Sequence, residues 1–228
     1  MDDSPGRPGE PSAPAAATMV PVILAAGAST RMGCTKALCD FDGRTCLELV
    51  LLACRDAGLA TPIVVLGFHA DEVRECASSA NATFVTNDRA ERGQTSSLKT
   101  GLAAAPPGAS AFLLYPVDFP LVTAADLGRL ASAWRARRSA HIVIPSHGHR
   151  RGHPVVFDMA FRDMFLRLPD DAPARWVVDA YADDNSYIEV DTPDVLMDMD
   201  TPADYARCLA AYRRRLGSAA LTPVGAGT

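Results

Sequence analysis

The residues best suited to chemistry lie in one short stretch, residues 20–36, with the sequence VPVILAAGASTRMGCTK. An apolar run breaks at Gly27, and the small-residue loop that follows carries Arg31 and closes on Lys36. Small residues let backbone N–H groups approach an anion, and the two cations add positive charge. The stretch has neither the G-K-S/T ending of a Walker loop nor the G-x-G-x-x-G dinucleotide fingerprint. It therefore predicts a triphosphate cradle of another type.

A carboxylate follows a second apolar run. The segment that starts at Ala111 is typical of a buried strand, and Asp118 stands at its end. Mg²⁺ bound to a triphosphate needs only a few protein oxygens, because phosphate and water supply the rest. Asp118 is thus a candidate magnesium ligand. The alternative is that Asp118 caps the turn before a helix at Ala124.

Two further acids near the end of the chain are candidates for the same site. Asp198 and Asp200 lie in the segment D-M-D-T-P. Either one, at the end of a strand, would complete a metal site with Asp118. Helix capping by Asp200 or Thr201, with Pro202 in the first helical turn, is the competing explanation.

Hydroxyl and amide groups gather in residues 87–98, NDRAERGQTSSL. Thr95 or Ser96 is expected to cap a helix that runs through residues 98–105. Free N–H groups at this helix start, together with Ser96 and Ser97, would suit an anion or a base edge. Capping alone would explain one of these hydroxyls.

Three histidines, His147, His149 and His153, lie close together in a loop. They suggest a transition-metal site, but no nearby cysteine or carboxylate completes a ligand set. A purely structural loop is the other alternative.

The elements that must position these groups alternate between strands and helices, which predicts a mostly parallel sheet. Gly67 would mark the ligand-side end of the second strand, and Gly58 would end the first helix. Strands are expected at 20–24, 62–66, 83–86, from 111, at 142–145, 155–157 and 187–190. Helices are expected at 45–57, 71–78, 98–105, 124–136, 160–168, 174–182 and from 202 onward.

The loop L-A-A-G-x-S-x-R-M-G-x-x-K resembles the signature loop of nucleotidyltransferases similar to the molybdenum cofactor cytidylyl- and guanylyltransferases. Four further motifs resemble that family in the same order along the chain: N…G…S-S-L, D-x-P at Asp118, G-H-P-V-x-F from Gly152, and D-x-D-T-P-x-D from Asp198. Phe119 departs from the usual middle residue of D-x-P. The resemblance covers residues 19–212. It implies a three-layer, Rossmann-like α/β nucleotidyltransferase fold with a mostly parallel twisted sheet.

The resemblance also implies roles for individual residues. Arg31, Lys36 and Asp118 would be catalytic, and Mg²⁺ would be held by Asp118 with Asp198 or Asp200. His153 and the pair Arg150 and Arg151 would meet the phosphate of the acceptor. The acceptor side would consist of Arg151, Gly152, His153 and Pro154. The nucleotide side would consist of Leu24, Ala25, Ala26, Gly27, Gly67, Asn87, Gly93, Ser96 and Ser97.

Ala26 indicates the choice of nucleotide. In this resemblance, the signature loop of the cytidylyltransferases has L-A-A-G and that of the guanylyltransferases has L-A-G-G. The leading hypothesis is transfer of CMP from CTP to the phosphate of molybdopterin, with release of pyrophosphate. One alternative is the same chemistry on a sugar or polyol phosphate, and another is a GTP-using cofactor guanylyltransferase. A third is a non-catalytic protein that delivers cofactor to a molybdoenzyme client, which the set Arg31, Lys36 and Asp118 argues against.

Composition limits the other classes of function. The chain has 228 residues and a net charge of −5, which argues against nucleic-acid binding. No apolar run has membrane-spanning length, so no membrane association is expected. Six scattered cysteines, including Cys34 in the signature loop, show no C-x-x-C pair, and reduced thiols in the cytoplasm are expected.

Three segments are expected along the chain. Residues 1–17, rich in Pro, Ala, Ser and Gly, would form a disordered extension. Residues 18–216 would form the nucleotidyltransferase domain, and 217–228 a flexible tail. The cluster Arg213, Arg214 and Arg215 would be a solvated helix end, with partner binding as the alternative.

Overall fold

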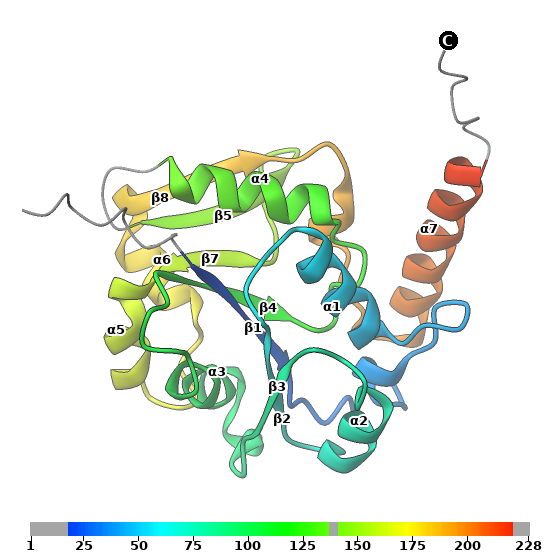
Figure 1. Ribbon diagram of the computed structural model, residues 1–228, viewed down its shortest axis with the longest axis horizontal. Coiled ribbons are helices and arrows are strands. Elements are labelled where there is room, and N and C mark those ends of the chain that lie inside the picture. The colour runs from blue at the N-terminus through cyan, green and yellow to red at the C-terminus, as the bar shows by residue number, and fades with distance from the viewer. Residues whose placement is uncertain (1–17, 137–140, 221–228) are drawn as a thin grey trace, which may run out of the picture.

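The computed structural model describes residues 18–136 and 141–220, so the expectations for residues 1–17 and 221–228 lie outside the described residues. The centre of the fold is one sheet of 8 strands in the order β3-β2-β1-β4-β7-β5-β6, with β8 paired to β5 (Figure 1). All neighbours are parallel except β7, which runs antiparallel to β4 and β5, and β6, which is antiparallel to β5. The mostly parallel sheet is thus confirmed. The strands are β1 Met19–Ala25, β2 Ile63–Leu66, β3 Thr83–Thr86, β4 Ala111–Pro116, β5 Ile142–His147, β6 Arg150–Arg151, β7 Val155–Asp158 and β8 Asn185–Glu189.

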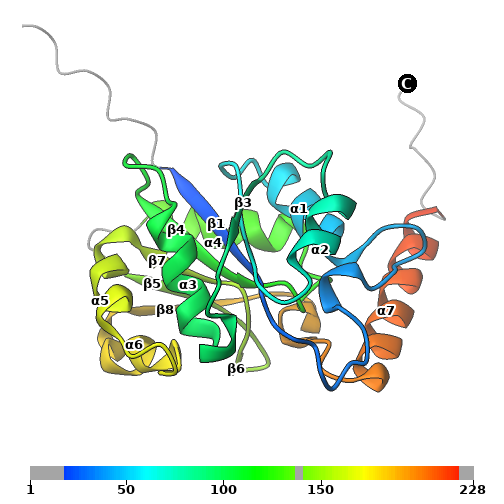
Figure 2. The same cartoon turned by 90° about the horizontal axis from the view of Figure 1, so that it is seen from below.

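Helices cover both faces of the sheet, which gives the three layers. One apolar core lies under α1, α2, α4 and α7, and a second lies under α3, α5 and α6. Figure 2 shows α5 and α6 beside α3, at the opposite end of the molecule from α7. Along the parts of the chain that the structure covers, no helix combines the length and apolar character needed to cross a bilayer. The helices are α1 Cys46–Asp56, α2 Ala70–Cys76, α3 Gln94–Ala103, α4 Ala124–Arg135, α5 Arg162–Arg167, α6 Arg175–Ala180 and α7 Pro202–Ala220.

Strand β1 explains why the sequence before the loop is continuously apolar. Every residue of β1 is buried, because the strand lies inside the sheet between β2 and β4. Its side chains alternate: Ile23 enters the first core, and Val22 and Leu24 enter the second. A strand covered on both faces needs apolar residues at every position.

The start of α3 differs from the prediction. The helix begins at Gln94, with Gly93 at the N-cap in a left-handed conformation (φ +114°). Neither Thr95 nor Ser96 is the cap, so that prediction was wrong. The Thr95 hydroxyl donates to the carbonyl of Ala172, and the Ser96 hydroxyl donates to the Arg89 carbonyl. Tertiary partners, rather than helix capping, use these two hydroxyls.

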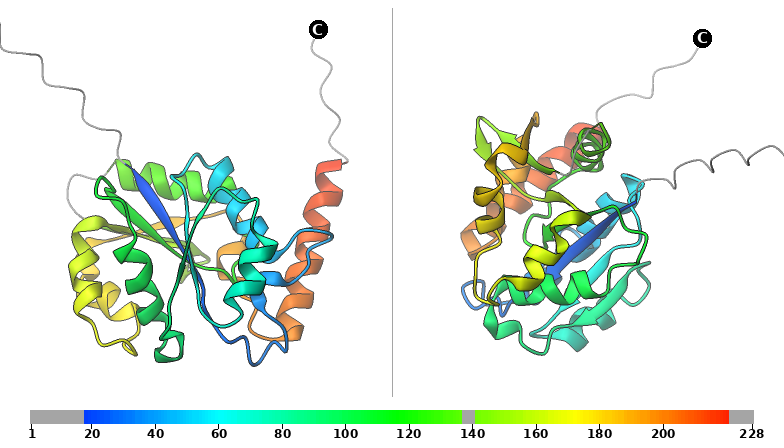
Figure 3. Two further views of the ribbon diagram at one scale, coloured as in Figure 1. Left: turned by 60° about the horizontal axis from the view of Figure 1, so that its bottom comes forward. Right: turned by 90° about the vertical axis from the view of Figure 1, so that its left-hand side faces the viewer.

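The last helix is anchored more firmly than predicted. Both nitrogens of the Arg213 side chain that face Asp42 donate to its carboxylate, at 2.6 and 2.9 Å. Arg215 pairs with the buried carboxylate of Asp194 and donates to the Leu121 carbonyl at 3.0 Å. Figure 3 shows α7 beside the loop that leads from β1 to α1. The helix continues through Gly217 to Ala220, so the arginine cluster does not form its end, and Arg213 and Arg215 contact the rest of the fold although Arg213 stays exposed.

Candidate active site

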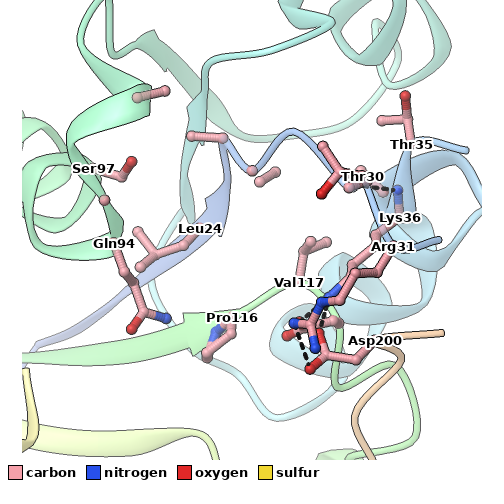
Figure 4. A pocket seen from close by; sticks show the side chains of 18 residues that line it. Leu24, Thr30, Arg31, Thr35, Lys36, Gln94, Ser97, Pro116, Val117 and Asp200 are labelled. Atoms are coloured by element: carbon pink, nitrogen blue, oxygen red, sulfur yellow. Dashed lines mark hydrogen bonds and ion pairs between the residues drawn. The ribbon is translucent and has the colours of Figure 1, made fainter. Parts of the chain in front are cut away.

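A cavity of about 290 Å³ opens where β1 and β4 end, and we call it the loop cavity (Figure 4). The signature loop and Asp200 form one wall, and the start of α3 forms the opposite wall. Its position fits the rule that parallel sheets bind ligands beyond the carboxyl ends of their strands. The predicted residues that line it are Leu24, Ala25, Ala26, Gly27, Arg31, Lys36, Gly93, Ser97, Asp118 and Asp200.

The loop itself has a defined conformation. Ser29 has a positive φ of 53°, and its hydroxyl accepts the backbone N–H of Lys36 at 3.1 Å. Gly33 has a φ of +74°, a conformation that favours glycine. Met32 is buried beneath the loop. These contacts turn the chain back so that Arg31 and Lys36 both reach the loop cavity.

Four charged side chains meet at the edge of the loop cavity. The Lys36 ammonium lies 2.7 Å from a carboxylate oxygen of Asp118 and 2.6 Å from one of Asp200. Arg31 lies 2.9 Å from the other oxygen of Asp200. Burial alone would lower the pKa of Lys36, but the two carboxylates outweigh burial and raise it, so Lys36 stays charged. The hydrogen bond from Lys36 lowers the pKa of Asp200, which stays ionised.

Capping does not account for either carboxylate. Thr123 caps α4 in a reciprocal pair with Asp126, and Thr201 does the same for α7 with Asp204. Asp118 and Asp200 are therefore free of that structural task. One oxygen of Asp118 is bonded to Lys36, and the other is buried without a hydrogen-bond partner. A buried carboxylate oxygen without a protein partner is costly, so this oxygen is available to a cation or a hydrogen-bond donor.

The donor set suits a divalent cation that also binds phosphate. Asp118 and Asp200 already converge on one cationic group, and Asp118 has a spare oxygen. Two carboxylates match the needs of Mg²⁺ or Mn²⁺ when phosphate oxygens and water complete the coordination. Within residues 18–136 and 141–220, no group of three or more His, Cys, Asp or Glu side chains could hold a metal by itself.

Asp198 does not join these two carboxylates. Asp198 does not line the loop cavity. Partial burial and the nearby carboxylates of Asp200 and Asp118 raise its pKa. Residues 197–200 are irregular rather than a strand, so their two-residue spacing does not place both acids on one face. Of the predicted Asp118, Asp198 and Asp200, the two that contact Lys36 and line the loop cavity are Asp118 and Asp200.

The opposite wall is held by a buried polar network. The side-chain amide of Asn87 donates to the hydroxyls of Ser96 and Ser97, each at 3.0 Å. Ser97 lines the loop cavity, whereas Asn87 and Ser96 lie behind the wall. Gly67 also lies behind it, where a Cβ would come within 2.6 Å of both the Ala26 carbonyl oxygen and the Ala90 Cβ. Gly67 therefore permits close packing of β2 against the signature loop.

A second cavity of about 320 Å³ adjoins the first, and we call it the Arg151 cavity. Three of the four predicted acceptor residues line it, namely Arg151, Gly152 and His153, whereas Pro154 does not. Gln94, the first residue of α3, lines both cavities. Apart from Gln94 and these three, the lining is Leu114, Ile144, Val155, Phe157, Pro173, Ala174, Arg175 and Val178.

Gly152 and His153 are positioned by one backbone contact. The N–H of His153 donates to the Val195 carbonyl at 2.9 Å, and a Cβ on Gly152 would lie 2.5 Å from that oxygen. The His153 ring lies 4.9 Å from the ring of Phe119, beside Asp118. Burial lowers the pKa of His153, so the ring is neutral near pH 7, with its Nδ1 lacking a hydrogen-bond partner.

Arg151, one of the two arginines that line this cavity, is exposed. Arg151 pairs with Asp179 at 3.0 Å, and its guanidinium lies 5.4 Å from the centre of the Tyr187 ring. His147 does not line this cavity, and its Nδ1 contacts the Val190 carbonyl at 2.9 Å. The neighbouring Arg150 lines neither cavity.

Sequence reasoning missed Gln94 and Arg175. Gln94 lies inside the segment that carries Ser96 and Ser97, but its exposed amide has no motif to mark it. Arg175 is brought to Arg151 only by the packing of α6. No periodicity or spacing could have found these two positions.

A small-residue loop, two cations and two carboxylates at the strand ends of a parallel sheet define a nucleotide-handling α/β protein. The chain belongs to the family described as "MobA-like NTP transferase domain", which matches residues 21–185, and it is a nucleotidyltransferase. The predictions of family, fold and enzyme class are therefore confirmed.

Three relatives illustrate the similarity. The molybdenum cofactor cytidylyltransferase of Escherichia coli strain K12 is 26% identical over 84% of this chain and 95% of its own length. A nucleotidyl transferase from Methanothermobacter has a TM-score of 0.76 and 25% identity, covering 87% of this chain and 99% of that one. A Mycobacterium tuberculosis protein solved in complex with manganese has a TM-score of 0.69 and 27% identity, covering 85% and 99%.

Proposed function

We propose that this protein transfers CMP from CTP to the phosphate of a molybdopterin-type acceptor and releases pyrophosphate. The observation that carries the proposal is the meeting of Arg31, Lys36, Asp118 and Asp200 beside the small-residue loop, with a second cavity adjoining it. The similarity to a molybdenum cofactor cytidylyltransferase supports the choice of acceptor. Ala26, the second alanine of L-A-A-G, supports cytidine as the base.

The nucleotide would lie in the loop cavity. Backbone N–H groups of Ala26 and Gly27 would bind phosphate oxygens or the base. Arg31 and Lys36 would turn from the carboxylates toward the triphosphate and neutralise the charge that develops on pyrophosphate. Asn87 and Ser96 would act from behind the wall by fixing Ser97, and Gly67 would act by allowing the loop to pack closely.

Asp118 and Asp200 would hold the divalent cation, and Mg²⁺ is the ion we propose. A cation there supplies positive charge to the phosphate oxygens of the nucleotide. The manganese complex of a relative is consistent with a divalent cation in this fold.

The acceptor would lie in the Arg151 cavity. A phosphate monoester is already an anion, so its attack on the α-phosphorus needs no strong general base, and catalysis relies on positioning and charge neutralisation. Arg151 would bind the acceptor phosphate. Neutral His153 would donate a hydrogen bond rather than a charge. Gly152 and cis-linked Pro154 would shape the backbone there.

The lining of the Arg151 cavity favours a cofactor acceptor over a sugar or polyol phosphate. Its floor is formed by aliphatic and aromatic residues such as Leu114, Ile144 and Phe157. Sugar hydroxyls would lose their hydrogen bonds to water against such a surface. A flat ring system that carries a phosphate fits it better.

The test is incubation of the protein with molybdopterin cofactor, Mg²⁺ and each of the four ribonucleoside triphosphates. We expect a cytosine dinucleotide and one pyrophosphate per turnover with CTP, detected by mass spectrometry and a pyrophosphate assay. Pyrophosphate released with simple sugar phosphates, but not with the cofactor, would favour the alternative acceptor. Absence of any dinucleotide with every nucleotide would refute the proposal.

A further inference from the structure

Two cysteine sulfur atoms lie in contact on the turn that carries Lys36. The Sγ atoms of Cys34 and Cys39 are 3.4 Å apart. Cys34 is exposed and Cys39 is buried. A disulfide needs a separation near 2.05 Å, which small side-chain rotations from such a contact would provide. The other exposed thiol, Cys76 at the end of α2, has no such sulfur contact within the described residues.

We propose that Cys34 and Cys39 form a reversible disulfide, a modification site that fixes the Lys36 turn and weakens nucleotide binding. The first half rests on the sulfur contact and on exposure alone. The second half also rests on the proposed function, because it concerns the nucleotide.

The two thiols differ in the way that a sequential reaction requires. Burial, together with the smaller effect of the adjacent Cys34 sulfur, raises the pKa of the Cys39 thiol to about 12. Cys39 therefore stays protonated, and the exposed Cys34 reacts first. Once Cys34 is oxidised and carries no charge, it no longer opposes ionisation of Cys39.

A small disulfide such as oxidised glutathione is the oxidant. The Cys34 thiolate attacks one sulfur of glutathione disulfide, the new S–S bond forms, and one glutathione thiolate leaves. Cys39 then loses its proton to solvent and attacks Cys34 Sγ, which expels the second glutathione. Two protein thiols lose two electrons, and one glutathione disulfide becomes two thiols.

The bond would close a ring around the residues that face the nucleotide. Thr35 and Lys36 lie between the two cysteines, and both line the loop cavity. The turn is already tight, since Leu38 N–H donates to the Thr35 carbonyl at 2.9 Å and Cys39 N–H to the Lys36 carbonyl at 3.2 Å. Lys36 must leave Asp118 and Asp200 to meet a triphosphate. A cross-link across its turn restrains that movement.

The cross-link can be read directly, because trypsin cleaves between the two cysteines. Cleavage after Arg31, Lys36 and Arg44 places Cys34 in MGCTK and Cys39 in ALCDFDGR. After treatment with oxidised glutathione, we expect these two peptides to be joined in the wild type and in Cys76→Ser. Neither Cys34→Ser nor Cys39→Ser should give the joined peptide, and dithiothreitol should release it. A persistent glutathione adduct on Cys34 or a link from Cys39 to Cys46 would overturn the proposal.

The effect of the disulfide on nucleotide binding is measured in a separate experiment. Titration of a fluorescent CTP analogue with Mg²⁺ should show about tenfold weaker binding to the oxidised wild type, restored by dithiothreitol. Cys34→Ser treated in the same way should keep its affinity. Unchanged affinity in protein that is fully cross-linked would overturn the effect on the nucleotide, while the peptide map would still decide the disulfide. Failure of the reduced protein to bind any nucleotide would count against the proposed function instead.

Discussion

The two adjoining cavities differ in how their charges are balanced. In the loop cavity, two cations and two carboxylates neutralise each other within a few ångströms. In the Arg151 cavity, Arg151 is paired with Asp179 at the surface, and most of the lining is apolar. The first is built on the parallel half of the sheet, and the second on the antiparallel strand β7 and its neighbours. Under the proposed function, the two parts of the sheet would separate phosphate chemistry from recognition of the rest of the acceptor.

The largest effect should follow from changing Asp118. Asp118→Asn keeps the shape but removes the carboxylate that has a free buried oxygen, and we expect kcat/KM to fall about 10³-fold. Steady-state kinetics with CTP and Mg²⁺ checks this. Asp198→Asn is the matched control, because Asp198 lies outside the loop cavity, and its activity should change by about twofold at most. Equal losses of activity in the two variants would show that placing Asp118 inside the site and Asp198 outside it is wrong.

The next effect tests the other cavity. Arg151→Ala should raise the acceptor KM about 10- to 100-fold, because a hydrogen bond to a charged group is lost, while CTP affinity stays the same. Arg150→Ala is the control, since Arg150 lines neither cavity. The exposed pair with Asp179 contributes little to stability, so thermal unfolding should not change much. A loss of CTP binding in Arg151→Ala would contradict the assignment of the two ligands to different cavities.

Two glycines offer a paired test of whether the two cavities bind their ligands independently. A Cβ on Gly67 would collide with the Ala26 carbonyl beside the loop cavity, and a Cβ on Gly152 would collide with the Val195 carbonyl beside the Arg151 cavity. Each change to alanine should cost about 1–3 kcal/mol of unfolding free energy, measured by denaturant titration. Calorimetry should show weaker CTP binding for Gly67→Ala and weaker acceptor binding for Gly152→Ala.

Gly128, in α4, provides the control for this pair. A Cβ there meets nothing within 4 Å, so Gly128→Ala should leave both ligands unaffected and slightly stabilise the helix. The same affinity loss for both ligands in both glycine variants would contradict independent cavities.

The smallest effect is expected at the residue that lines both cavities. Gln94 lines both cavities, so Gln94→Ala should weaken binding of CTP and of the acceptor by about fivefold each, as expected for one neutral hydrogen bond. Isothermal titration with each ligand alone, and then with both, measures this. An effect confined to one ligand would place Gln94 in that cavity only.

Most helices and strands could be predicted from local patterns in the sequence. The helix expected at 45–57 is α1, which Thr45 and Glu48 cap reciprocally, and the apolar run expected to be a strand at 20–24 lies within β1, which is buried on both faces. Lys36 and Asp118 were also identifiable, because each follows a strand that ends at the same edge of the sheet. Their meeting across the cavity is a consequence of β1 pairing with β4.

The remaining features depend on distant contacts that no local pattern contains. Thr95 is not a helix cap because its hydroxyl is taken by the carbonyl of Ala172, which is far along the chain. Asp200 rather than Asp198 reaches Lys36 because of the irregular chain between β8 and α7. Gln94 and Arg175 gain their places only when α3 and α6 pack against the sheet.

The docking of α7 has a consequence for one carboxylate of the loop cavity. Asp200 lies directly before the helix that Arg213 and Arg215 hold against the rest of the fold. The position of that helix therefore limits where the Asp200 carboxylate lies relative to Lys36. A substitution that loosens the docking of α7 would alter the electrostatic balance of the loop cavity from a distance, without changing any residue that lines it.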